Sequence, residues 1–249
     1  MSILKKRGIV DVGLVDEMTC VKGEHVRCQD CPNKDTRTSG TRGPKDSLIV
    51  IIGMCPGQTE LTQGEPFVGG SGRLLASALS FSKVDIDEVY LMNVVNCSPL
   101  GPTKGLTNEQ LKACRSRLAQ DVSNIQSKVV IPLGGEALQA ITGFKGPNNG
   151  ISSWRGYIID PTESMAVGPL TKAVVPSFHP SFIRRTGLRY FHYLARDINR
   201  ATRMANGSCT LLEPRPTNDP IPTLRPDKLG IDIETKGFSH QIEQIGLAW

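Results

Sequence analysis

Four short runs of apolar, mostly β-branched residues alternate with longer amphipathic stretches between residues 48 and 205. Each run is short enough for a strand that is buried on both faces, as in a parallel sheet. The runs are Leu48–Ile52, Val89–Val95, Val129–Leu133 and Ala173–Pro176. Because helical patterns separate them, the chain is expected to form a doubly wound α/β domain with a mainly parallel four-stranded sheet flanked by helices.

Helical periodicity is clearest after Thr107, where apolar residues recur at steps of three and four. These residues are Leu111, Cys114, Leu118, Val122 and Ile125, and they form one apolar face. Further helices are expected at Gly72–Ser80, Glu136–Ile141 and Arg189–Met204. Ligands of such α/β domains bind beyond the C-terminal ends of the strands, so the residues of a binding site are expected there.

The two ends of the chain differ from this central part. Residues 1–45 are polar and glycine-rich and show no sustained period. Residues 207–227 contain five prolines, which exclude both helix and central strand and indicate a linker. A strand at Lys228–Ile233 and its hairpin partner at Gln241–Trp249 follow. The expected organisation is therefore a domain at 1–206, a linker at 207–227 and a truncated piece of a second domain at 228–249.

Charge and composition narrow the class of protein. The net charge of +5 suits a polyanionic partner such as nucleic acid. No apolar run of 18 residues and no secretory signal occur, so we expect a cytoplasmic protein without a membrane partner. Seven cysteines, an odd number in a reducing compartment, argue against a disulfide framework and favour metal ligation.

Four cysteines have the spacing of a sulfur-ligated metal site. Cys28 and Cys31 share one tight turn, Cys97 follows a predicted strand, and Cys114 lies in the helix after it. Four thiolates suit either zinc or an iron–sulfur cluster, and the ligands alone do not choose between them. The plainer interpretation treats Cys97 and Cys114 as ordinary buried thiols, and Cys20 is the one substitute ligand.

Three loops at strand ends carry candidate binding groups. The segment 53–57 (GMCPG) follows the first strand, 65–72 (EPFVGGSG) leads into a helix, and 177–181 (SFHPS) follows the last strand. Glycine-rich backbone at a helix N-terminus can hold a phosphate or a polar base edge, although glycines also serve plain turns.

In this order, the segments resemble the iron–sulfur uracil-DNA glycosylases often called family 4. The resemblance spans about residues 28–205 and rests on seven motifs. They are a CxxC turn, a GxxPG loop, PFVG before a helix, Asn-Val-Val-x-Cys, an Ala-Cys helix, a Leu-Gly-Gly turn and a His-Pro-Ser loop. It implies a uracil-DNA glycosylase fold, hydrolysis of the N-glycosidic bond of uracil, and uracil-containing DNA as partner. It also implies a structural 4Fe-4S cluster on Cys28, Cys31, Cys97 and Cys114.

The resemblance also assigns a pocket for a flipped base, lined by Gly53 and Cys55. Phe67 would stack on uracil, and the Asn93 amide would pair with uracil O4 and N3 and reject cytosine, whose donor and acceptor are exchanged. His179 would donate a hydrogen bond to uracil O2 as negative charge develops there.

DNA contacts are expected on either side of this pocket. Ser71, Ser181, Arg184 and Arg185 would contact the DNA backbone, and the segment 182–185 resembles a wedge that fills the vacated base stack. A solvated basic turn is the plainer interpretation of the two arginines.

Two departures from the family pattern weaken the expected activity. Met54 occupies the catalytic position where the family usually has a glutamate that places the attacking water, and Glu60 is a candidate substitute. At 96–100 the chain reads NCSPL where the family commonly has Lys-Cys-Arg-Pro-Pro, which removes two positive charges near DNA. We expect slower hydrolysis of the glycosidic bond and weaker binding of DNA.

The last segment resembles the first motif of the 3′–5′ exonuclease domain of family A DNA polymerases. Asp232 and Glu234 stand at i and i+2 on the predicted strand, as in an incomplete magnesium site. This implies the N-terminal piece of a larger, bacteriophage-type polymerase, acting in a bacterial host cytoplasm with other replication proteins. Two alternatives are a non-catalytic uracil- and DNA-binding module of a polymerase, which Met54 favours, and a zinc-stabilised nucleotide-binding protein.

Overall fold

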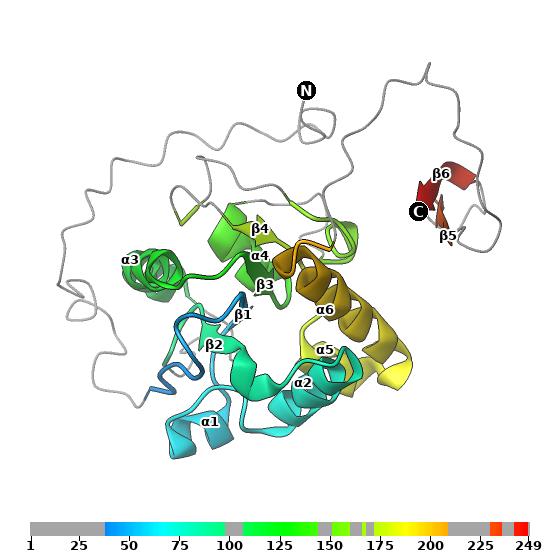
Figure 1. Cartoon of the computed structure of the whole chain (residues 1–249). Coiled ribbons are helices and arrows are strands. Elements are labelled where there is room, and N and C mark those ends of the chain that lie inside the picture. The colour runs from blue at the N-terminus through cyan, green and yellow to red at the C-terminus, as the bar shows by residue number, and fades with distance from the viewer. Residues whose placement is uncertain are drawn as a thin grey trace. The chain divides into compact units, whose positions relative to one another are not determined.

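The computed structural model describes residues 38–97, 107–143, 151–159, 166–167 and 172–208, and the backbone of 230–235 and 242–248 (Figure 1). Two compact units divide the chain, Met1–Thr210 and Leu211–Trp249. This division falls inside the stretch predicted to be a linker. The predicted domain boundaries themselves stay predictions.

The first unit is built on a four-stranded, entirely parallel sheet with the strand order β2-β1-β3-β4. The strands are β1 (Ile49–Gly53), β2 (Tyr90–Asn93), β3 (Val129–Pro132) and β4 (Ala173–Val174). Every residue of these strands is buried, which explains their continuous apolar runs. The predicted fold class is confirmed.

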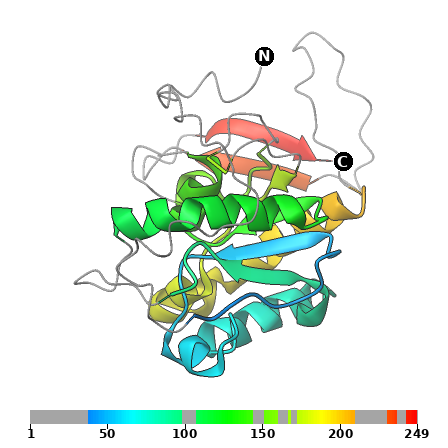
Figure 2. The same cartoon turned by 90° about the vertical axis from the view of Figure 1, so that its left-hand side faces the viewer.

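Helices cover both faces of the sheet and create two hydrophobic cores. Ile49 and Ile51 face α2 (Gly70–Phe81) and α6 (Phe191–Ala205), whereas Val50 and Ile52 face α3 (Asn108–Asn124) and α4 (Gly135–Thr142). Figure 2 shows α3 and α2 on opposite sides of the strands. Successive strand residues point to opposite faces, so each strand contributes to both cores.

The helix boundaries follow from local capping. Helix α3 begins after Thr107 because a capping box forms there: Thr107 Oγ1 accepts from the Gln110 N–H, and Gln110 Oε1 accepts from the Thr107 N–H. Helix α6 begins two residues later than predicted, because residues 188–190 form a 3₁₀ turn, η4 (Leu188–Tyr190). The other 3₁₀ turns are η2 (Ile86–Glu88) and η3 (Ile151–Ser153).

Two short helices were not predicted from the sequence. Helix α1 (Gln58–Gln63) follows the loop after β1, and α5 (Pro180–Thr186) follows the loop after β4. The α5 start is marked by Pro180 at the first helical position and by His179, whose side chain caps the helix. Both helices lie at the C-terminal ends of the strands and therefore border the site.

The second unit contains an antiparallel hairpin of β5 (Gly230–Thr235) and β6 (Ile242–Ala248), with Asp232 opposite Gly246. Strands therefore lie at the two segments where the sequence predicted them. Within the described part of the chain, no helix is both long and apolar enough to cross a membrane.

Candidate active site

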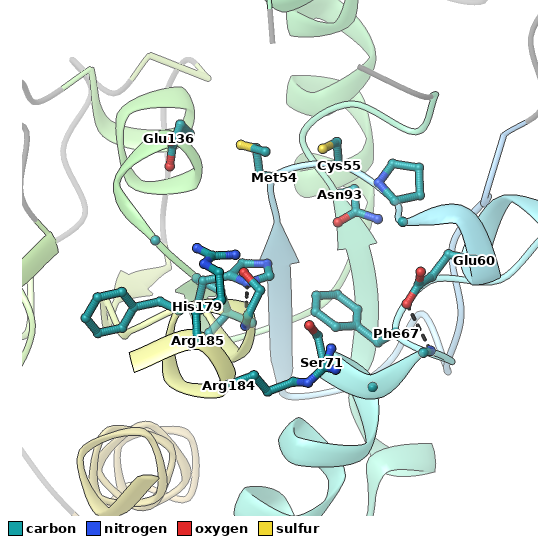
Figure 3. A pocket seen from close by; sticks show the side chains of 18 of the residues that line it. Met54, Cys55, Glu60, Phe67, Ser71, Asn93, Glu136, His179, Arg184 and Arg185 are labelled. Atoms are coloured by element: carbon teal, nitrogen blue, oxygen red, sulfur yellow. Dashed lines mark hydrogen bonds between the residues drawn. The ribbon is translucent and has the colours of Figure 1, made fainter. Parts of the chain in front are cut away.

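A cavity of about 750 Å³ lies at the C-terminal ends of the strands of the first unit (Figure 3). Its walls come from the loop after β1, the segment leading into α2, the end of β2, the β3–α4 turn and the start of α5. All three glycine-rich or histidine-bearing loops singled out in the sequence meet there, as expected for a parallel α/β sheet.

Asn93 and Phe67 line the cavity, and Gly53 packs against both of them. The register of β1 and β2 places Gly53 directly beside Asn93. A Cβ atom on Gly53 would lie 2.4 Å from Asn93 Oδ1 and 2.8 Å from Phe67 Cζ. Any side chain at position 53 would therefore displace an amide that can read a base edge and a ring that can stack on a base face.

Phe67 is held in an unusual backbone conformation. Its φ of 59° lies in the left-handed region, which is rare for a bulky residue and costs about 1–3 kcal/mol. Helix α2 presses on this segment, since a Cβ on Gly72 would lie 1.5 Å from the Phe67 carbonyl oxygen. Gly72 thus lets the helix approach, and the ring, 7% exposed, is fixed against the cavity.

Asn93 is supported from behind by α3. The Arg117 Nη2 donates to the carbonyls of Asn93 at 2.9 Å and Val94 at 2.6 Å. The Val94 and Val95 N–H groups donate to the carbonyls of Gly53 and Met54, so the end of β2 is bonded on both sides. Asn93 is 3% exposed, and these hydrogen bonds hold its backbone in place.

Glu60 stabilises the loop that carries Phe67. Its Oε1 accepts a hydrogen bond from the Gly69 N–H at 2.9 Å, and its carboxylate packs against Gly57. The residue is buried, at 9% exposed. Glu60 therefore connects α1 to the start of α2, and this is a structural task rather than the water-placing task considered for it from the sequence.

The geometry defines the hydrogen-bonding state of His179. Its Nδ1 accepts from the Ser181 N–H at 3.0 Å, so in the neutral ring the proton resides on Nε2. Burial, and then the positive charge of Arg185, lower the pKa of His179 to about 4. At neutral pH this side chain is an uncharged Nε2–H donor at the cavity, 6.5 Å from the Phe67 ring centroid.

A buried polar group supports the loop that carries His179. Asp197, on α6, accepts from Ser177 Oγ at 2.7 Å and pairs with Arg155 at 3.2 Å. Burial raises the pKa of Asp197, while the Ser177 hydrogen bond and the Arg155 charge oppose that rise. The Arg155 guanidinium also lies over the Phe178 and Tyr193 rings, at 5.3 and 4.2 Å from their centroids.

The segment expected to be a DNA wedge divides into two parts. Ile183 is completely buried and Phe182 stacks on Phe178 with centroids 5.2 Å apart. Ile183 is therefore wrong as a wedge, because α5 turns it into the core. Arg184 and Arg185 are exposed and line the cavity.

The polar groups expected to contact DNA lie around the cavity mouth. Ser71 and Ser181 also line the cavity, and the Arg184 guanidinium lies over Gly70, where a Cβ would be 2.7 Å from it (Figure 3). Leu188, just beyond α5, is 69% exposed and was not singled out from the sequence.

Met54, Cys55 and Glu136 line the same cavity (Figure 3). Burial, and secondarily the negative charge of Glu136, raise the pKa of the Cys55 thiol to about 11, so it stays protonated. Glu136 was not recognised as a site residue, because it stands in a helical pattern with nothing in the sequence to mark it.

The predicted metal ligands are only partly within the described residues. Cys97 is half-buried and Cys114 buried, and both belong to the core beneath α3. Cys28 and Cys31 lie outside the described residues, and no group of three or more candidate ligands occurs in the part that is described. Asp232 and Glu234 lie on β5 of the second unit.

The parallel sheet and the cavity at its C-terminal edge define an α/β protein whose pocket offers an aromatic face, an amide and a neutral histidine donor. The family model of the uracil DNA glycosylase superfamily matches residues 41–199. The chain belongs to this superfamily.

Individual relatives cover the same region. A type-4 uracil-DNA glycosylase of Thermotoga maritima is 34% identical over 68% of this chain and 85% of the relative. One of Sulfurisphaera tokodaii is 28% identical over 67% of this chain and 76% of the relative. One of Archaeoglobus fulgidus is 32% identical over 47% of this chain and 60% of the relative.

Proposed function

We propose that this protein hydrolyses the N-glycosidic bond of uracil in DNA, releasing uracil and leaving an abasic site. The observation that carries the proposal is the meeting of Phe67, Asn93 and His179 in one cavity. These residues come from the segment before α2, the end of β2 and the loop before α5, and they supply the face, the edge and the leaving-group contact that a flipped base requires.

Recognition follows from the chemistry of the uracil edge. Asn93 can donate from its amide nitrogen to O4 and accept from N3–H with its oxygen, while cytosine presents the opposite pattern. Phe67 stacks on the ring, and Gly53 leaves the space that the Asn93 amide and the Phe67 ring occupy. A mismatched base would leave buried polar groups unpaired, which costs about 1–3 kcal/mol for each group.

The chemical step breaks the C1′–N1 bond, and its electron pair leaves with uracil. Negative charge then develops on O2, where the His179 Nε2–H donates a hydrogen bond. The Ser181 N–H keeps this proton on Nε2, so the donor needs no rearrangement during the reaction. A donor of this kind contributes about 3–4 kcal/mol of transition-state stabilisation.

Met54 makes the proposed enzyme slow. A thioether cannot accept a proton from the attacking water, so the position lacks the carboxylate common in the family. This feature also favours the second candidate function, a non-catalytic module that binds uracil in DNA. The two functions differ in one measurable respect, which is turnover.

We further propose a 4Fe-4S cluster on Cys28, Cys31, Cys97 and Cys114. Two observations support it: Cys97 and Cys114 lie in one core, and Thr38 pairs with Cys97 through a β-bridge. This bridge brings the N-terminal chain to Cys97, and Thr38 follows Cys31 by seven residues, an extended reach of about 25 Å. When bound, the cluster supplies a structural cross-link between the N-terminal segment and the domain.

DNA binding is proposed around the cavity mouth. Arg184 and Arg185 are exposed there and suit the phosphates on either side of the flipped nucleotide. Ser71, at the start of α2, and Ser181, at the start of α5, add polar contacts to the backbone.

For the second unit we propose an incomplete magnesium site of the 3′–5′ exonuclease type, in a polymerase that acts in the cytoplasm with other replication proteins. Its support is the pair Asp232 and Glu234 on β5. A two-metal site with only its first carboxylates should not degrade DNA. Magnesium-dependent digestion that Asp232→Ala abolishes would contradict this proposal.

Single-turnover cleavage and DNA affinity, measured on a uracil oligonucleotide, test the proposed function. We expect His179→Ala to lower cleavage about 100-fold or more with little change in affinity. We expect Met54→Glu to raise cleavage, because a carboxylate acts on the chemical step. Absence of cleavage in wild-type protein that binds uracil-DNA, with a His179→Ala defect confined to affinity, would favour the binding module.

A further inference from the structure

Among the described residues that line the cavity, two are acids, Glu60 and Glu136. Hydrolysis of a glycosidic bond benefits from a carboxylate near the sugar, because positive charge develops on the sugar and the attacking water loses a proton. Met54 supplies no such group, so these two side chains are the candidates within the described cavity.

Glu60 is already hydrogen-bonded to the segment that leads into α2. Its Oε1 is bonded to the Gly69 N–H, and the residue is 9% exposed. The carboxylate also fills the space beside Gly57, where a Cβ would lie 2.7 Å from Oε2. Turning Glu60 toward a water in the cavity would leave the Gly69 N–H without its acceptor.

Glu136 is placed differently. It stands in the first turn of α4, it is exposed, and it lines the cavity. A Cβ on Gly134 would lie 3.7 Å from Glu136 Oε2 and 3.4 Å from His179 Cβ. The carboxylate and the histidine thus flank the same glycine, at the turn after β3.

Glu136 also lies near the position of the missing acid. Strands β1 and β3 are neighbours, so the loop with Met54 and Cys55 adjoins the turn that carries Glu136. The negative charge of Glu136 acts on Cys55, the residue after Met54. Figure 3 shows Met54 and Glu136 at the same end of the cavity.

We propose that Glu136 is the catalytic carboxylate of this protein and replaces, from the β3–α4 turn, the acid that position 54 lacks. The inference rests on the proposed glycosylase function. As the C1′–N1 bond breaks, uracil leaves with the electron pair. A water oxygen forms the new bond to C1′, and its proton passes to the Glu136 carboxylate and then to solvent.

If Glu136 were only a carboxylate at the rim of the cavity, with no catalytic role, Glu136→Gln would have the opposite effect on the cleavage rate. An exposed negative charge at a DNA-binding mouth repels phosphates, so its removal would strengthen binding and leave or raise the cleavage rate. The catalytic role predicts a lower rate at saturating enzyme, whatever happens to affinity. The two explanations therefore differ in the sign of the change in rate.

The test is single-turnover cleavage of a uracil oligonucleotide at saturating protein, with affinity measured in parallel. We expect Glu136→Gln to lower the rate about 100-fold, the lower end of the range for general acid–base groups. Met54→Glu in the Glu136→Gln background should restore it. The control is Glu88→Gln, which removes the same charge from an exposed residue before β2, at the other end of the sheet.

The outcomes separate this inference from the proposed function. If the wild-type protein cleaves and Glu136→Gln cleaves at the same rate or faster, the role of Glu136 is overturned. The glycosylase function would then still stand. Cleavage by Met54→Glu but not by wild type would overturn both, because Glu136 would then not replace the missing acid.

Discussion

Gly53→Ala is the substitution whose effect the structure defines most sharply. The added methyl group would lie 2.4 Å from Asn93 Oδ1 and 2.8 Å from Phe67 Cζ, well inside van der Waals contact. Both neighbours resist movement: the end of β2 is bonded to Arg117, and α2 packs on the Phe67 backbone. The amide or the ring must therefore turn out of its position.

The expected effect of Gly53→Ala has two parts, one on stability and one on uracil recognition. Overpacking of a buried site costs about 1–3 kcal/mol of the free energy of unfolding. Loss of the two hydrogen bonds from Asn93 to uracil, at about 0.5–1.5 kcal/mol each, corresponds to about a 5- to 150-fold loss in kcat/KM. The stability term is measured by urea unfolding, and the recognition term by cleavage kinetics on uracil and cytosine substrates.

Gly64→Ala is the matched control. Gly64 has a φ of 76°, so alanine is strained there, but no atom lies within 4 Å of the added Cβ. We expect a stability loss of about 1 kcal/mol with uracil cleavage retained. Wild-type kinetics in Gly53→Ala, or equal losses of activity in both variants, would refute the role of Gly53 in positioning Asn93 and Phe67.

Three further predictions concern other parts of the site. His179 should titrate near pH 4 by NMR, and a native pKa near 6.5 would contradict the buried donor. Because the unfolded chain takes up this proton near pH 6.5, the free energy of unfolding should fall as pH decreases from 6.5 toward 4. Arg117→Met should lower the free energy of unfolding in urea by about 1–3 kcal/mol, because it leaves buried carbonyls unpaired. It should also reduce selectivity for uracil over cytosine by loosening Asn93, and unchanged selectivity would argue against the support of Asn93 by Arg117. Cys97→Ser or Cys114→Ser should remove the visible absorbance and iron of the purified protein, and a full iron content in either variant would exclude that residue as a ligand.

The sheet could be predicted because its strands are buried on both faces. Such strands read as continuous apolar runs, and Val129–Pro132 lies within the predicted run. The loops could be located because ligand-binding loops follow these strands. Gly53, Asn93 and His179 lie at strand ends or in the loops that follow them; Asn93 and His179 line the cavity, and Gly53 packs against Asn93.

The missed features depend on contacts between distant residues. Arg117 binds a carbonyl 24 positions away, and Ser177 reaches Asp197 over 20 positions. No local period reveals such pairs. Helix α5 was missed because it has only seven residues, and without it the burial of Ile183 could not be foreseen.

The most direct test of the central claim is detection of free uracil released from DNA by the purified protein. An oligonucleotide with a single uracil is incubated with excess protein, and uracil and the abasic strand are quantified by mass spectrometry. We expect slow release of one uracil per strand, with the abasic product in equal amount, and loss of release in His179→Ala. Intact substrate after prolonged incubation, with the DNA demonstrably bound, would contradict it.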